Sequence, residues 1–165
     1  MQQPCHEEER SALLQFKHSF TIDASASKFQ GAYPKVSSWK AQGKRRNCCE
    51  WDGIECDEKT GHVIGVDLSS SCLFGSTNSN STLFRLVHLQ RLNLADNHFN
   101  FSRIPTAIGR LSMLTSLNLS ASMFSGQSQL KFQVCPSCFP LIYQSTIQMV
   151  LERGFWNLNI PISEA

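Results

Sequence analysis

One apolar pattern occurs twice between Leu86 and Gln127, and it constrains the fold more than any other feature of the chain. Five apolar positions of the first copy recur 25 residues later, so that Leu86, Leu89, Leu92, Leu94 and Phe99 correspond to Leu111, Leu114, Leu117, Leu119 and Phe124. A unit this short cannot cover its own apolar side, so successive units must stack and bury one continuous core. The sequence therefore predicts an array of stacked repeats.

Within each copy, the leucines two positions apart predict a short β-strand. Leu92 and Leu94 would share the face that points into the core, while the residues on either side of them point outward. An earlier, partial copy places Val66 and Leu68 at 26 residues before Leu92 and Leu94. Stacking would therefore give about three strands, with their outward side chains aligned on one broad concave surface.

The spacing within the copy that begins at Leu86 carries a family resemblance. L-x-x-L-x-x-L-x-L-x-x-N, read from Leu86 to Asn97, and the I-P and I-G pairs at 104–105 and 108–109 resemble the plant-type extracellular leucine-rich repeat. The resemblance implies an α/β repeat fold, a leucine-rich-repeat solenoid with a short parallel sheet of about three strands. Pro105 fixes φ and lacks an N–H group, so the convex side should be extended or tightly turned rather than a long helix.

The same repeat places a buried asparagine at the turn out of each strand, and Asn97 holds that position here. In the family its carboxamide satisfies backbone groups of the turn. The equivalent residues of the neighbouring copies are Ser71 and Ser122. Because a hydroxyl has fewer hydrogen-bonding groups than a carboxamide, we expect this ladder to be weak on either side of Asn97.

A second set of motifs covers residues 5 to 56. They are a leading cysteine, E-R-x-A-L-L-x-F-K from Glu9 to Lys17, a tryptophan, and C-C-x-W-x-G-I-x-C from Cys48 to Cys56. Together they resemble the N-terminal cap of plant leucine-rich-repeat receptors, receptor kinases and polygalacturonase inhibitors. Residues 5–20 also predict an amphipathic helix, because the acidic residues 7–9 suit the positive end of the helix dipole and an apolar face follows.

The resemblance implies two disulfides in the cap, Cys5 with Cys48 and Cys49 with Cys56. A zinc site is the alternative for four cysteines, but C-C-x₆-C lacks the paired C-x₂-C spacing that brings two thiolates to one metal. The chain has seven cysteines, so at least one thiol stays unpaired within the monomer. The remaining three have no assigned pairing: Cys72, Cys135 and Cys138.

These patterns divide the chain into three parts. Residues 1–61 form the cap, residues 62–127 the leucine-rich repeats, and residues 128–165 a divergent tail that we expect to be irregular or disordered. Ser128-Gln129 stands where the repeat would have I-P, and no repeat register follows. The tail is interpreted either as sequence outside the family's normal reading frame, which would make the product truncated, or as a C-terminal cap that seals the array.

Composition narrows the function. The net charge of +2 is too small to indicate a nucleic-acid partner, and the basic residues near position 45 lie in a polar, glycine-containing stretch. No apolar run reaches the roughly 18 to 20 residues of a membrane span, and no secretory signal follows Met1. No nucleophile, H-E-x-x-H or phosphate-binding motif occurs. We therefore predict neither an enzyme nor a cofactor or metal site.

The resemblance implies a binding module: the N-terminal fragment of a plant cell-surface receptor-like protein that perceives signals in defence or development. Its ligand would be a peptide, a protein or a carbohydrate, and a full-length product could use a co-receptor. The location implied is extracellular or at the plasma membrane. The alternatives are a secreted protein similar to polygalacturonase inhibitors, and a non-functional truncated product.

The candidate site is the concave strand face, and two further sets of residues follow from the sequence. The outward strand positions predicted to bind the ligand are Asp67, Ser69, Arg91, Asn93, Ala95, Asp96, Ser116, Asn118 and Ser120. N-glycosylation sequons begin at Asn80, Asn100 and Asn118. The strand position of Asn118 matches that of Asn93, so a glycan on Asn118 would obstruct a partner.

Overall fold

The computed structural model describes residues 3–43, 46–125, 148–152 and 155–159. In these residues it contains one α-helix, α1 (Glu7–His18), and short 3-10 helices that include η2 (Lys35–Ser38), η3 (Cys48–Glu50), η4 (Thr82–Arg85) and η5 (Thr106–Arg110). The strands are β1 (Thr21–Ile22), β2 (Ile54–Cys56), β3 (Val63–Asp67), β4 (Leu73–Phe74), β5 (Arg91–Asn93), β6 (Ser116–Asn118), β7 (Gln148–Glu152) and β8 (Phe155–Asn159).

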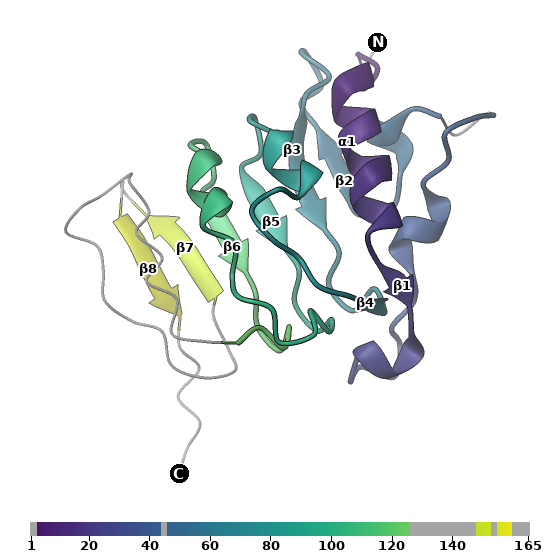
Figure 1. Ribbon diagram of the computed structural model, residues 1–165. Coiled ribbons are helices and arrows are strands. Elements are labelled where there is room, and N and C mark those ends of the chain that lie inside the picture. Colours follow the sequence, from purple (N-terminus) through teal and green to yellow (C-terminus); the bar gives the residue numbers. More distant parts are fainter. Residues whose placement is uncertain (1–2, 44–45, 126–147, 153–154, 160–165) are drawn as a thin grey trace.

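Six strands form one mixed sheet in the order β2-β3-β5-β6-β7-β8 (Figure 1). The central strands β3, β5 and β6 are parallel, and Val66, Leu92 and Leu117 lie side by side in their register. On either side of them the pairing is antiparallel, with β2 against β3 and β7 against β6. The parallel part has the three strands that the repeat spacing predicts. β1 and β4 form a separate antiparallel pair.

The prediction of an irregular tail is wrong for residues 148–152 and 155–159, where the structure has β7 and β8. β7 pairs with the free edge of β6, with Ser116 beside Val150, and β8 pairs with β7. Both segments are rich in large apolar residues that favour strands, and an unpaired edge offers backbone groups for them to join. The prediction rested on the absence of a repeat register, which depends neither on the strand preference of these residues nor on the unpaired edge of β6. The other tail residues, Cys135 and Cys138 among them, lie outside the described residues.

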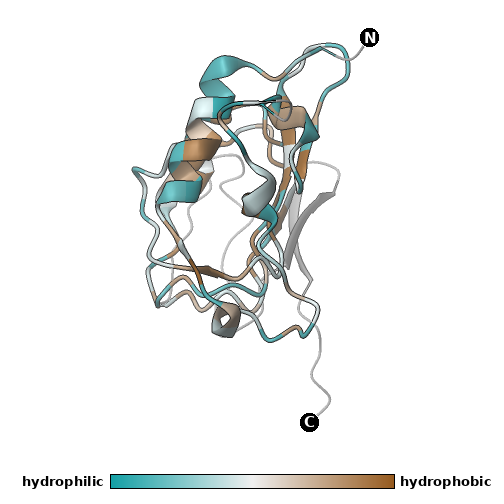
Figure 2. Cartoon of the chain, turned by 90° about the vertical axis from the view of Figure 1, so that its right-hand side faces the viewer, coloured by the Kyte–Doolittle hydropathy of each residue, from teal (hydrophilic) through white to brown (hydrophobic). Residues whose placement is uncertain are grey.

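The helix α1 is shorter than predicted by two residues at each end, but its character is as expected. Three glutamates occupy its first turn, and Lys17 and His18 its last, so both ends complement the helix dipole. Its buried side includes Leu13 and Phe16. α1, η4 and η5 lie on the same side of the sheet (Figure 1). In Figure 2, which views the chain from the side, apolar colouring marks both α1 and the strands.

Cap and repeats share a single apolar core. One buried cluster runs from α1 and the cap tryptophans Trp39 and Trp51 through to Leu117 on β6. Phenylalanines continue the contact from one unit to the next: the ring centroids of Phe20 and Phe99 are 5.6 Å apart, and Phe99 stacks on Phe124 at 4.7 Å. The convex connections are short 3-10 turns such as η5, not long helices, as the proline at 105 predicts.

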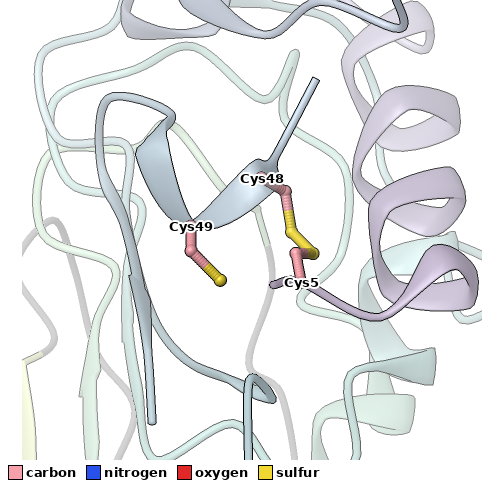
Figure 3. Close-up of side chains that lie close together, drawn as sticks. All are labelled: Cys5, Cys48 and Cys49. Carbon is pink, nitrogen blue, oxygen red and sulfur yellow. A yellow bond between two sulfur atoms is a disulfide. The ribbon is translucent and has the colours of Figure 1, made fainter. Parts of the chain in front are cut away.

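Both expected disulfides are present in the cap. Cys5 is bonded to Cys48 and Cys49 to Cys56, each with 5.5 Å between the Cα atoms. In Figure 3, Cys5 and Cys48 join the segment before α1 to η3, while the Cys49 side chain lies beside this disulfide without being bonded to it. These four sulfurs are therefore not available as zinc thiolates. Cys72 is a buried free cysteine.

Asn97 is buried and satisfies the backbone of the turn that follows the strand. It makes five hydrogen bonds of 2.7 to 3.2 Å, accepting at Oδ1 from the amides of Ser71 and Leu73 and donating from Nδ2 to the carbonyls of Leu68, Leu94 and Ala95. The Ser122 hydroxyl at the equivalent position donates to two carbonyls, with 2.8 Å to Leu94 O. As predicted, the serine makes fewer bonds than the asparagine.

Candidate functional site

The outward side chains of β3, β5 and β6 form the candidate site, called the strand face below. Inward residues of these strands are buried, with Leu92 at 1% and Leu117 at 0% exposure. The outward residues Asp67, Asn93 and Asn118 are aligned by the parallel register in one row across the three strands. This alignment follows directly from the period-two alternation of each strand. The structure therefore brings together residues that are 25 or 26 positions apart in sequence.

The row of Asp67, Asn93 and Asn118 repeats one local hydrogen bond. In each case a side-chain Oδ1 accepts from the backbone amide two residues later, at 3.0 Å. The bond fixes each side chain at the end of its strand and occupies its oxygen. Within the described residues, the carboxamide Nδ2 groups of Asn93 and Asn118 make no hydrogen bond. Three equally oriented side chains make this row the most regular polar feature of the strand face.

Asp67 is also tied to the cap. Lys35 Nζ lies 3.1 Å from Asp67 Oδ1, and the hydroxyl of Ser69 donates to the same oxygen at 2.6 Å. Burial by itself would raise the pKa of Asp67, but the hydrogen bonds from Ser69 and Lys35 outweigh it, and the pKa is lowered below its ordinary value. Asp67 therefore presents a carboxylate whose charge is already partly compensated by Lys35.

A neighbouring row contains an ion pair that the sequence reasoning missed. Arg91 Nη2 lies 2.6 Å from Glu55 Oε2, although Gly65 stands between them in the sheet. A Cβ at Gly65 would lie only 3.0 Å from Glu55 Oε2, so the missing side chain leaves room for the pair. Both partners are largely exposed, so we expect a contribution below about 1 kcal/mol to stability. Ser116 continues this row on β6.

Ala95 and Asp96 were predicted to lie on the strand face, but the structure places neither of them there. Ala95 is only 8% exposed. The strand β5 ends at Asn93, and Asp96 has a φ of +54°, so the backbone has already turned and the alternation of a strand no longer applies. Ser69 and Ser120, which are also beyond their strands, remain half-buried beside the row.

Asp96 instead holds a loop of the cap, residues 27–35, called the rim loop here. Its carboxylate accepts from the amides of Lys28 at 2.8 Å and Phe29 at 3.3 Å, and from the hydroxyls of Ser27 and Ser70. Burial would raise the pKa of Asp96, but these hydrogen bonds outweigh it and the pKa is lowered. Asp96 is therefore a structural residue of the cap–repeat junction.

The rim loop brings two exposed aromatic side chains to the carboxyl ends of the strands. Phe29 is 64% and Tyr33 51% exposed, and the Tyr33 amide donates to the carbonyl of Ser70 at 3.2 Å. A side-chain hydrogen bond to Asp52 raises the pKa of Tyr33. The sequence reasoning missed these residues, although aromatic residues within a polar loop are a signal that could have found them.

The three sequons lie in different settings. Asn80 and Asn100 are exposed, away from the strand face. Asn118 is half-buried within the row itself, beside Asn93. Modification of Asn118 would occupy one of the two carboxamide donors.

Two clusters within the described residues bring possible metal ligands together. One consists of Cys5, Cys48 and Cys49, which are in disulfides, and the other of Glu9, His62 and His88. The second cluster lies at the amino-terminal ends of β3 and β5, opposite the rim loop. In the part of the chain that the structure describes, no helix has the length and hydropathy to cross a bilayer.

Comparison with known proteins identifies the cap. Residues 6–57 match the family model described as "Leucine rich repeat N-terminal domain". The chain is similar to Receptor-like protein 6 of Arabidopsis thaliana, with 46% identity over 138 residues that cover 79% of this chain and 14% of the relative. It is also similar to Receptor-like protein Cf-9 of Solanum pimpinellifolium, with 44% identity over 114 residues that cover 64% of this chain and 13% of the relative.

The fold has a counterpart among solved structures. A crystal structure of a plant ice-binding protein aligns with a TM-score of 0.57 and 27% sequence identity, covering 81% of this chain and 40% of that one. The matched relatives have the names of receptor-like proteins rather than of enzymes. The chain spans about one seventh of their length, as the 14% and 13% coverages show.

Proposed function

Because this chain belongs to the plant leucine-rich-repeat receptor-like proteins, we propose that it is a ligand-binding module for signal perception at the cell surface, in defence or development. The segment shared with the relatives contains the cap and the first strands. Two disulfides in the cap support an extracellular position, since such bonds persist in oxidising compartments.

The observation that carries this proposal is the row of Asp67, Asn93 and Asn118. The Oδ1 atom of each residue in the row accepts a hydrogen bond from a backbone amide, so Asn93 and Asn118 keep their Nδ2 groups as donors for a ligand. Neighbouring strands are spaced by about 4.8 Å, so a chain-like ligand lying across them would meet a new side chain at each strand. The ligand that fits is rich in acceptor oxygens, either the carbonyls of a peptide or protein, or the hydroxyls of a carbohydrate.

The other exposed groups fit the same kind of ligand. Arg91 and Glu55 offer both charges beside the row, and the rim-loop aromatics Phe29 and Tyr33 offer flat apolar surfaces at its edge. Aromatic side chains contribute large contact areas at binding sites. A full-length product could also use a co-receptor.

The experiment measures binding of defined probes to the folded, disulfide-bonded chain. The probes are peptides selected from a random dodecapeptide library, chitin oligomers and oligogalacturonides. Asn93→Asp replaces the donor with an acceptor at nearly constant size and keeps the local bond to the Ala95 amide. We expect it to weaken binding of the retained probe about tenfold, because losing a hydrogen bond at a binding site costs about 1 to 1.5 kcal/mol.

Asn78→Asp is the matched control, because Asn78 is exposed, lies outside the strands and makes the same bond to an amide two residues later, at 2.8 Å. Its probe affinity should equal that of the unmodified chain. The proposal is contradicted if none of the probes binds, or if both substitutions change affinity equally.

A further inference from the structure

Three side chains with metal-binding atoms meet where the cap joins the repeats. Glu9 comes from the first half of α1, His62 from the residue before β3, and His88 from the turn before β5. Glu9 is only 8% exposed, which is unusual for an acidic residue unless its charge is compensated. The strand face does not include these residues, so the inference is independent of the proposed function.

The Glu9 carboxylate has one oxygen fixed and one directed at the histidines. Its Oε2 accepts from the amide of Val63 at 2.9 Å. Its Oε1 is hydrogen-bonded to His62 Nδ1 at 3.2 Å and lies 3.7 Å from His88 Nδ1. The Val63 amide binds the carboxylate oxygen that the histidines do not face and so fixes the orientation of the carboxylate, as hydrogen-bond partners of metal ligands do.

The imidazole of His88 lacks a hydrogen-bond partner at the atom that faces this carboxylate. His88 Nδ1 is buried, and 3.7 Å to Glu9 Oε1 is too long for a hydrogen bond. Buried polar nitrogens are normally paired, so an unpaired one aimed at a carboxylate indicates a missing group between them. A cation there would accept the lone pair of the imidazole and compensate the carboxylate at once.

The rings are held in place by stacking. The ring centroids of His62 and His88 are 3.7 Å apart, and His6 stacks on the other side of His62 at 3.9 Å. His6 Nε2 is itself bonded to the carbonyl of Thr60 at 2.8 Å. An imidazole binds a metal in the plane of its ring, so two stacked rings cannot both bind one ion, and ion binding would have to turn the His88 ring out of its stack with His62.

We propose that Glu9, His62 and His88 form a Zn²⁺ site. Bonds of 2.0 to 2.1 Å in tetrahedral geometry place neighbouring ligand atoms about 3.3 Å apart. The two distances to Glu9 Oε1, 3.2 and 3.7 Å, lie on either side of that value, and all three ligand atoms lie within 4.8 Å of one another. Rotation of the His88 ring out of its stack with His62 would close the triangle.

The chemistry of the three ligands and the exposure of the two histidines indicate which ion would bind. Two imidazoles and one carboxylate suit zinc and its neighbours, whereas calcium and magnesium prefer sites made of oxygens. The side chains of His62 and His88 are 28% and 39% exposed, which leaves a path for the ion and a fourth position for water. Bound zinc would join α1 to two repeat units and stabilise the cap–repeat junction.

The test is a titration of the full, disulfide-bonded chain, without a histidine tag, with Zn²⁺ by calorimetry and by thermal unfolding. We expect uptake of one ion per chain and a melting temperature that rises with Zn²⁺ and falls back on adding a chelator. Glu9→Gln keeps an oxygen for the Val63 amide but loses the charge, and His88→Gln removes one ligand. Each should weaken Zn²⁺ binding by about tenfold or more.

His18→Gln is the matched control, because His18 is exposed at the end of the same helix. Its affinity should equal that of the unmodified chain, and Ca²⁺ should give no saturable uptake. The proposal is overturned if the unmodified chain takes up no Zn²⁺, or if His88→Gln binds it as tightly as His18→Gln. His88 is in a partly exposed turn, so its variant decides the question even if Glu9→Gln fails to fold.

Discussion

At the scale of single residues, Gly53 shows why the cap motif contains a glycine. Its φ is +78°, and a Cβ there would lie 2.2 Å from the carbonyl oxygen of Asp67. Gly53 O also accepts from the Asp67 amide at 2.7 Å, so the two backbones are in direct contact. The glycine allows the last part of the cap to pass close to the first strand of the repeats.

Gly53→Ala should therefore destabilise the chain much more than Gly43→Ala. Gly43 has a similar φ of +90° but nothing within 4 Å of the added atom. Both variants carry the strain of an alanine at positive φ, and Gly53→Ala adds overpacking of about 1 to 3 kcal/mol. Urea unfolding of both variants measures the difference, and equal free energies of unfolding would refute the close backbone contact.

Asp96→Asn tests the junction between rim loop and repeats. Because hydrogen bonds lower the pKa of Asp96 in the folded chain, its stabilisation is present above the unfolded pKa of about 3.9 and is lost as pH falls through the lower folded value. At pH 7 we expect the variant to lose about 1 to 3 kcal/mol, since carboxylate hydrogen bonds are replaced by weaker ones.

The difference in free energy of unfolding between the unmodified chain and Asp96→Asn should then shrink toward zero as pH falls below 4. Urea titrations at several pH values measure it, and the other acidic groups cancel in the comparison. A difference that stays constant between pH 7 and pH 3 would show that the charge of Asp96 does not hold the rim loop.

At the scale of elements, Asn93 at the end of β5 and Leu94 directly after it lie on opposite sides of the sheet, one on the strand face and one in the core. Leu94 is 5% exposed, and its amide donates to the carbonyl of Asn118 at 2.9 Å, whereas Asn93 lies on the strand face. Leu94→Asp buries an unpaired charge between two repeat units and should unfold the array. Asn93→Asp should leave it folded.

Circular dichroism shows whether the Leu94→Asp and Asn93→Asp variants are folded, and urea unfolding measures their free energies of unfolding. A folded Leu94→Asp variant, or an Asn93→Asp variant as unstable as it, would reverse the assignment of inward and outward positions.

The elements also show where sequence reasoning works and where it stops. The 25-residue repeat and the period-two alternation within each copy predicted the three parallel strands and the row of Asp67, Asn93 and Asn118, because both features are periodic in the sequence. Ala95 was misplaced because alternation holds only as far as the strand runs. The Glu55–Arg91 ion pair, the rim loop and the Glu9 cluster depend on contacts between distant segments, which no local pattern specifies.

At the scale of the whole molecule, the cap and the first repeats share one apolar core. The buried cluster passes from α1 to β6 without interruption, and the phenylalanine contacts link Phe20 to Phe99 and Phe124. Asp96, through its hydrogen bonds to the rim loop, and Glu9, through its bond from the Val63 amide, link the cap to the repeats. Each strand of the strand face is backed by this core.

The central claim is that β3, β5 and β6 stack in parallel with Val66, Leu92 and Leu117 in one register. Nuclear Overhauser contacts between the methyl groups of these residues in the folded chain test it most directly. The account predicts cross-peaks from Val66 to Leu92 and from Leu92 to Leu117, which are 26 and 25 positions apart in sequence. If both are absent while other buried methyl pairs give contacts, the stacked strands and the strand face built on them are contradicted.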